Sequence, residues 1–176
     1  VPYQRARIET FLNPALDPRG AGYNALQAMI AVGSGQLLGR GLGRGTQSHL
    51  RFLPEFHTDF IFATLVEELG FLGGIGLLLL YAVLAWRLLL PYIHGRIENP
   101  FVFFYTIGLF ALLLAQVMIN AGMNMGIIPV TGITLPLVSY GGSSVLSLAI
   151  AFGLLFALRR GGGAGRDIAI HSGNPI

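Results

Sequence analysis

The chain has 176 residues, of which 53% are hydrophobic and 11% charged, and its formal net charge is +3. Charged residues are about half as frequent as in ordinary globular domains, which indicates a membrane protein rather than a water-soluble one. The absence of cysteine excludes a disulfide framework and a thiolate metal site.

Residues 1–59 form a polar segment with six arginines, four carboxylates and many turn-forming dipeptides. Between Gly22 and Gly33, four apolar side chains recur at helical spacing. They are Tyr23, Leu26, Met29 and Ile30. We expect one short helix here, too short to span, with its apolar face on a bilayer or bundle surface. The chain begins at Val1 with no signal peptide before the first apolar run, which favours a piece of a longer protein.

Three long apolar runs follow and predict transmembrane helices joined by short segments. The expected order is a span at 60–90, a polar loop at 91–100, a span at 101–119, an irregular segment at 120–142, a span at 143–158 and a tail at 159–176. The tail is expected to be disordered from Gly161 onward. The predicted fold class is all-α, a polytopic membrane helix bundle.

The segment 120–142 carries no charge, yet Pro129, Pro136 and five glycines interrupt it. It cannot form one regular helix, so we expect a re-entrant or cavity-lining segment. The loop at 91–100 and the tail hold arginines, which predicts that they are cytoplasmic and that 1–59 and 120–142 are extracytoplasmic. The arginines of 1–59 then either belong to a simple translocated domain or are held there for an anionic ligand such as a lipid phosphate. We favour the second interpretation.

Glycines recur at 33–45 around Arg40 and Arg44. The run lacks both the dinucleotide and the P-loop patterns, so it is not a nucleotide loop. Exposed backbone amides beside the two arginines are expected either to cradle a diphosphate or to belong to a flexible loop.

Asp59 lies where the polar segment meets the first apolar run, in Phe56-His57-Thr58-Asp59-Phe60. One interpretation makes Thr58 or Asp59 the N-cap of the following helix. The other is chemical: Asp59 and Glu67 share a helical face, with Glu67 about 12 Å deeper, and a partly dehydrated carboxylate can act as a general base on a sugar hydroxyl. His57 is a second candidate base or a headgroup contact.

Short motifs along residues 3–158 carry a resemblance to a known family. They are Tyr3-Gln4, Arg7-Ile8, Phe11-Leu12-Asn13-Pro14, Asp17-Pro18, Gly20-Ala21-Gly22-Tyr23, Gln27, Gly33-Ser34-Gly35, Gly45-Thr46-Gln47-Ser48, Phe52-Leu53-Pro54-Glu55, His57-Thr58-Asp59-Phe60-Ile61-Phe62-Ala63, Glu67-Glu68-Leu69-Gly70 and Pro136-Leu137-Val138-Ser139-Tyr140-Gly141-Gly142-Ser143. In these motifs the chain resembles the SEDS family of bacterial RodA, FtsW and SpoVE proteins, and most nearly its RodA branch.

The resemblance implies the large fourth extracellular loop and the last three helices of a ten-helix protein of the bacterial inner membrane. It implies a peptidoglycan glycosyltransferase for elongation and cell shape, which polymerises lipid II, the undecaprenyl-diphosphate-linked disaccharide peptide, with a class B penicillin-binding protein. The essential aspartate of the family is then Asp59. Family members also use residues of earlier helices, so this piece alone is expected to be inactive.

The chemistry expected from the resemblance is inverting glycosyl transfer with Asp59 as the general base. Substrate-binding candidates, chosen by charge and position, are Arg5, Arg7, Arg40, Arg44, His57 and Glu67. A divalent cation such as magnesium is left open as a cofactor, and no nucleic acid is expected.

Two alternatives stay open. The first is a lipid II flippase, because broken membrane segments often line substrate pathways. Its polar candidates are Asn120, Asn124, Thr131, Thr134 and Ser139. The second is a scaffold for the penicillin-binding protein, with close helix packing at the glycines. These are Gly70, Gly73, Gly74 and Gly76.

Overall fold

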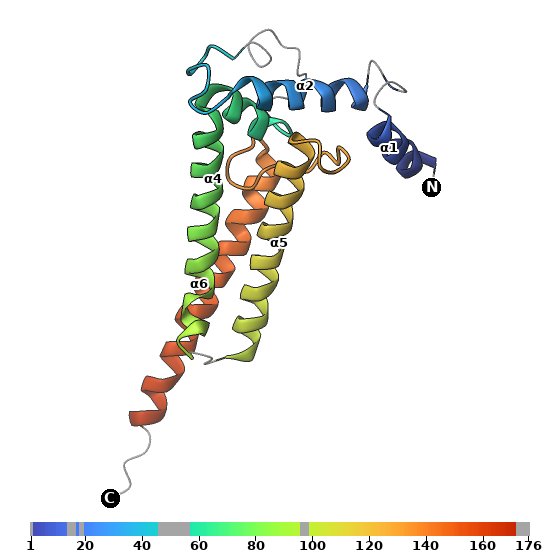
Figure 1. Cartoon of the computed structure of the whole chain (residues 1–176). Helices are drawn as coiled ribbons and strands as arrows, with labels where there is room; N and C mark the ends of the chain where they lie inside the picture. Colours follow the sequence, from blue (N-terminus) through green and yellow to red (C-terminus); the bar gives the residue numbers. More distant parts are fainter. Residues whose placement is uncertain (1, 14–16, 18–19, 46–56, 96–98, 172–176) are drawn as a thin grey trace, which may run out of the picture.

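The computed structural model describes residues 2–13, 17, 20–45, 57–95 and 99–171 (Figure 1). Within these ranges the chain is helical and has no strand. The helices are α1 (Pro2–Leu12), α2 (Ala21–Ser34), α4 (Ile61–Ile93), α5 (Pro100–Asn124) and α6 (Gly142–His171). Three of them, α4, α5 and α6 as far as Arg160, are long and apolar enough to cross a membrane. The predicted all-α bundle with three spans is confirmed.

Helix α2 lies across one end of the bundle, and α6 ends at the other (Figure 1). Ala28 and Ala31 of α2 are buried against Phe60 and Ala63 at the beginning of α4. The small alanine side chains let the two backbones approach closely, so the packing fixes α2 directly above the start of the first span.

The short helix expected between Gly22 and Gly33 is therefore present, and its expected apolar face is only partly covered by the bundle. Leu26 and Ile30 are 46% and 43% exposed, while the alanines on another face are buried. Periodicity of large side chains predicted the helix correctly, while the small residues Ala28 and Ala31 make its close contact with α4.

Helix α4 changes direction at Gly70, whose φ of 76° and ψ of −174° are not helical. The part before Gly70 passes beneath α2, and the straight part from Phe71 to Ile93 descends along the bundle (Figure 1). At 1.5 Å per residue the straight part is about 34 Å long, close to the thickness of a bilayer core. The first two turns of α4 therefore belong to the end of the bundle that carries α2.

Polar contacts tie the opposite end together. The Asn99 side chain caps α5 by accepting from the Phe101 amide at 2.9 Å. The Tyr105 hydroxyl donates to the Ala151 carbonyl at 3.1 Å, and Arg159 donates to the Leu88 carbonyl at 3.0 Å. Leucines and a valine form the core between these contacts. The buried residues there are Leu88, Val102, Leu109, Leu113, Leu148 and Leu155.

Three expectations about helix limits were wrong. Helix α1 was not predicted, because a helix without an apolar stripe gives no periodic signal. Helix α6 continues through Gly161 to His171, although disorder was expected there. A glycine costs only about 1 kcal/mol in a helix, and propagation adds one hydrogen bond per residue, so Gly161, Gly162, Gly163 and Gly165 do not suffice to end it. Helix α5 runs to Asn124, so the irregular segment is residues 125–141 rather than 120–142.

Candidate active site

Asp59 is half-buried in a turn at residues 57–60, directly before α4. The N-cap of α4 is Phe60, which makes no side-chain capping hydrogen bond. The expectation that Thr58 or Asp59 occupies the N-cap position is therefore wrong. The helix begins against buried apolar packing by Phe60 and Ala63, so it does not depend on a capping oxygen at that position.

The backbone of the turn is held by residues far away in the sequence. The Tyr140 amide donates to the His57 carbonyl at 2.9 Å, and the Ser139 hydroxyl donates to the Thr58 carbonyl at 2.6 Å. The same hydroxyl accepts from the Leu135 amide at 2.7 Å. The irregular segment 125–141 therefore binds the backbone carbonyls of the two residues that precede Asp59.

Two asparagines of α5 hold the Asp59 carbonyl itself. The Asn120 side-chain amide donates to it at 2.9 Å, and the Asn124 side-chain amide donates at 3.1 Å. Asn120 also donates to the Ile133 carbonyl at 2.7 Å. Each of the three carbonyls from His57 to Asp59 is thus bonded to α5 or to the segment that follows it.

The carboxylate of Asp59 lies against Gly132. A Cβ added at Gly132 would lie 3.4 Å from Asp59 Oδ2, and the glycine has a φ of 74°. The next residue back, Thr131, accepts a 3.3 Å hydrogen bond at its carbonyl from the Arg7 guanidinium of α1. A cation and the candidate base therefore approach the same stretch of backbone.

Residues 36–41 of the glycine-rich run pair with residues 67–72 of α4 around its bend. Four backbone hydrogen bonds make this pairing: Arg40 N to Glu67 O at 3.0 Å, Gly41 N to Glu68 O at 3.0 Å, Phe71 N to Gln36 O at 2.8 Å and Leu72 N to Leu37 O at 3.2 Å. Two further amides of the run, those of Gly39 and Arg44, donate to carbonyls within it. The amides expected to cradle a diphosphate are thus already bonded at these positions, and that expectation is wrong for them.

The side chains of Arg40 and Arg44 are exposed, and Arg40 Nε donates to the Ser34 carbonyl at 3.4 Å. Both residues lie at the Gly70 end of the first part of α4, whereas Arg7 lies at the Asp59 end. Nine helical residues, about 14 Å, separate the two ends. The structure therefore places Arg7 nearer to Asp59 than Arg40 and Arg44. The Arg5 side chain lies outside the described residues.

Glu67 is fully buried, in the part of α4 that precedes the bend. It was expected deeper inside the span than Asp59. Because α4 turns at Gly70, Glu67 instead belongs to the end of the bundle that carries α2. His57 is exposed beside Asp59. Among the residues that the structure describes, no three histidine, cysteine or carboxylate side chains gather to hold a metal ion. A divalent cation such as magnesium stays open as a cofactor.

Asn120, Asn124 and Ser139 were not recognised as part of the Asp59 site. Sequence reasoning had assigned them to a substrate pathway in the flippase alternative. The sequence did contain a signal for a structural role of these asparagines. Asn120 and Asn124 are four residues apart on one helical face, just before an irregular membrane segment. Irregular backbone at that depth needs donors and acceptors supplied by protein.

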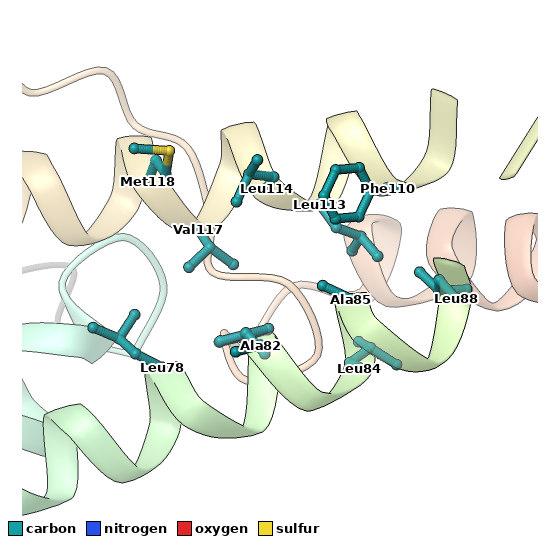
Figure 2. A pocket seen from close by; sticks show the side chains of 11 residues that line it. Leu78, Ala82, Leu84, Ala85, Leu88, Phe110, Leu113, Leu114, Val117 and Met118 are labelled. Carbon is teal, nitrogen blue, oxygen red and sulfur yellow. The ribbon is translucent and has the colours of Figure 1, made fainter. Parts of the chain in front are cut away.

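A cavity of about 290 Å³ lies between the straight part of α4 and α5, and its lining is apolar (Figure 2). Its one hydroxyl-bearing lining residue, Tyr81, donates to the Pro136 carbonyl. With no charged side chain in its lining, the cavity offers a place for hydrocarbon and no group for proton transfer.

Comparison with known proteins gives one family and several relatives. Residues 1–161 match the model of the family described as "Cell cycle protein", which comprises FtsW, RodA and SpoVE. The chain is 49% identical over 156 residues to the "Peptidoglycan glycosyltransferase MrdB" of Escherichia coli (strain K12), covering 89% of this chain and 42% of that protein. It is 47% identical to the "Stage V sporulation protein E" of Bacillus subtilis (strain 168), covering 90% and 43%.

The chain also resembles a solved structure, described as "Structural coordination of polymerization and crosslinking by a peptidoglycan synthase complex". The TM-score is 0.67 at 33% identity, and the match covers 92% of this chain and 43% of that one. The chain thus spans about two fifths of the length of these relatives.

Proposed function

Because the chain belongs to the FtsW, RodA and SpoVE family, we propose that it serves a peptidoglycan glycosyltransferase that polymerises lipid II for cell elongation. The full-length protein would be a multi-pass protein of the bacterial inner membrane, with Asp59 as its general base. The observation that carries the proposal is the hold on Asp59: the three carbonyls from His57 to Asp59 are all bonded to α5 or the segment after it. A carboxylate whose backbone is fixed in this way can present one direction to a substrate.

The proposed step is an inverting displacement. The 4-hydroxyl oxygen of the acceptor GlcNAc forms a bond to C1 of the donor MurNAc, and its proton passes to the Asp59 carboxylate. The bond from C1 to the diphosphate oxygen breaks, and undecaprenyl diphosphate leaves with the electron pair. Half-burial of Asp59 strengthens electrostatic interactions there compared with open water.

The leaving diphosphate needs cationic partners. Arg7 is the first candidate, because it bonds to Thr131 beside the glycine that lies against Asp59. Arg40 and Arg44 are exposed at the other end of the first part of α4, where a longer lipid-linked substrate would reach them. Arg5 remains a candidate by charge alone.

The bonds made by the asparagines favour catalysis over transport. Asn120, Asn124 and Ser139 are three of the five polar residues of the flippase alternative, and their side chains form hydrogen bonds to the Asp59 turn. A class B penicillin-binding protein remains the proposed partner, in line with the coupling of polymerization and crosslinking named for the similar complex.

The test is polymerisation of lipid II by the purified full-length protein in detergent, where no bilayer has to be crossed. We expect Asp59→Asn to abolish glycan synthesis while the protein still folds and binds its partner. Glu68→Gln is the matched control, because it neutralises another carboxylate at the same end of α4, and it should retain activity. Normal synthesis by Asp59→Asn would remove Asp59 from the mechanism, and wild-type protein that makes no glycan under any condition would point to transport.

A further inference from the structure

The geometry points to Asn120 and Asn124 as positioning residues for the Asp59 carboxylate. This inference rests on the proposed role of Asp59 as the base. It adds two residues of α5 that act through Asp59 and do not themselves touch the reacting atoms.

Both asparagines are fully buried, and their donors are used in full. Asn120 divides its amide group between the carbonyls of Asp59 and Ile133, at 2.9 and 2.7 Å. Asn124 divides its own between the carbonyls of Asp59 and Asn120, at 3.1 and 2.8 Å. The Asp59 carbonyl therefore accepts two donors, the most that a carbonyl oxygen with two lone pairs accommodates well.

Fixing this carbonyl has a direct geometric effect. With the Thr58 carbonyl held by Ser139, both peptide units that flank the Asp59 Cα are fixed, and with them the direction in which the side chain starts. Only the side-chain torsions of Asp59 remain to be set, and Gly132 lies against the carboxylate at that point. Because Asn120 also holds Ile133, the neighbour of Gly132, one side-chain amide positions both the base and the backbone beside it.

An ordinary turn would not need this arrangement. Carbonyls in a turn at the end of a bundle can be satisfied by water, whereas those of Asp59 and Thr58 are bonded to side chains 61 to 81 residues away. The bonds come from a helix and from an irregular segment that both enter the membrane bundle. These bonds fix the position of the turn relative to α5 and the segment 125–141.

The experiment uses the full-length protein with lipid II as substrate. We expect Asn120→Ala and Asn124→Ala to lower kcat roughly tenfold to a hundredfold with little change in KM, because a displacement of about 1 Å is enough for losses of this size. In both variants, backbone amide hydrogen exchange should become faster in the peptide containing residues 57–64 and stay unchanged in α6. Ser139→Ala, a smaller change that removes the bond to Thr58, should show the same pattern to a lesser degree.

Thr106→Val is the matched control. Thr106 is also a fully buried polar residue of α5, but it bonds to Tyr92 and Val102 at the opposite end. It should cost stability without lowering kcat. If the asparagine variants lose stability as Thr106→Val does and keep their kcat, the positioning role is wrong.

Two further outcomes keep the inference apart from the proposed function. If Asp59→Asn is inactive and both asparagine variants and Ser139→Ala have wild-type kcat, the inference fails alone. If Asp59→Asn is active, the proposed base fails and the inference fails with it. Should Asn120→Ala and Asn124→Ala not fold, Ser139→Ala decides, and wild-type kcat together with unchanged exchange at residues 57–64 in that variant would overturn the inference.

Discussion

The bend of α4 at Gly70 is a precise target for a stability test. In Gly70→Ala, the new Cβ would come closer than 3.0 Å to the Gly39 nitrogen and the Leu37 carbonyl oxygen, and the positive φ disfavours any side chain. Both neighbours are backbone atoms, so no rotamer change relieves the overlap. Either the residue stays strained or the pairing between residues 36–41 and 67–72 opens.

These two outcomes set the range for the loss in the free energy of unfolding of Gly70→Ala. The conformation of Gly70, with φ of 76° and ψ of −174°, is populated almost only by glycine and costs about 1–3 kcal/mol for a residue with a Cβ, before any overlap is counted. Opening the pairing loses four backbone hydrogen bonds, at about 1 kcal/mol net for each. The chain adopts the cheaper outcome, so we expect a loss of about 2–4 kcal/mol in the free energy of unfolding.

Thermal unfolding of the full-length protein in detergent measures this loss. We expect Gly70→Ala to lower the apparent Tm by about 5–10 °C. Gly76→Ala is the control, because Gly76 also lies within α4 but a Cβ there meets nothing within 4 Å. It should leave Tm unchanged or raise it slightly, since alanine is the better helix former. Equal Tm values for the two variants would refute the argument that the bend depends on glycine.

Two further predictions concern the surroundings of Asp59. Gly132→Ala should lower kcat roughly tenfold in the lipid II assay, because the positive φ of Gly132 disfavours any side chain and its relief would shift the backbone against which the carboxylate lies; unchanged kcat would show that the carboxylate does not work from this position. Arg7→Gln keeps a donor for the Thr131 carbonyl and removes the charge, so we expect a higher KM for lipid II and a weaker dependence of KM on salt. Arg87→Gln, an exposed arginine on α4 near the other end of the bundle, should change neither quantity.

Much of the architecture could be predicted from local sequence. Long uncharged runs predicted the three spans, because a helix inside a bilayer needs about 20 apolar residues whatever surrounds it. The change from polar to apolar sequence placed Asp59 at the end of a span. These features depend only on composition along a short window.

The structural features that the sequence did not predict depend on contacts between residues far apart in the chain. The bend at Gly70 requires the backbone of residues 36–41, and nothing around Gly70 itself reveals that neighbour. The asparagines of α5 look like pathway residues until the Asp59 carbonyl is placed beside them. Arg7 was chosen by charge, and only the position of α1 distinguishes it from Arg40 and Arg44.

One physical requirement links the bend of α4 and the Asp59 turn. Backbone that leaves the helix where packed protein excludes water must find hydrogen-bond partners in the protein. Residues 36–41 find theirs at the bend of α4, and residues 57–59 find theirs in α5 and the segment 125–141. The helical stretch Ile61–Leu69 connects the two pairings, so a strain at Gly70 can be passed along it to the Asp59 turn. If that connection is rigid, Gly70→Ala should lower kcat as well as Tm, and a variant that lost only stability would show that the two pairings act independently.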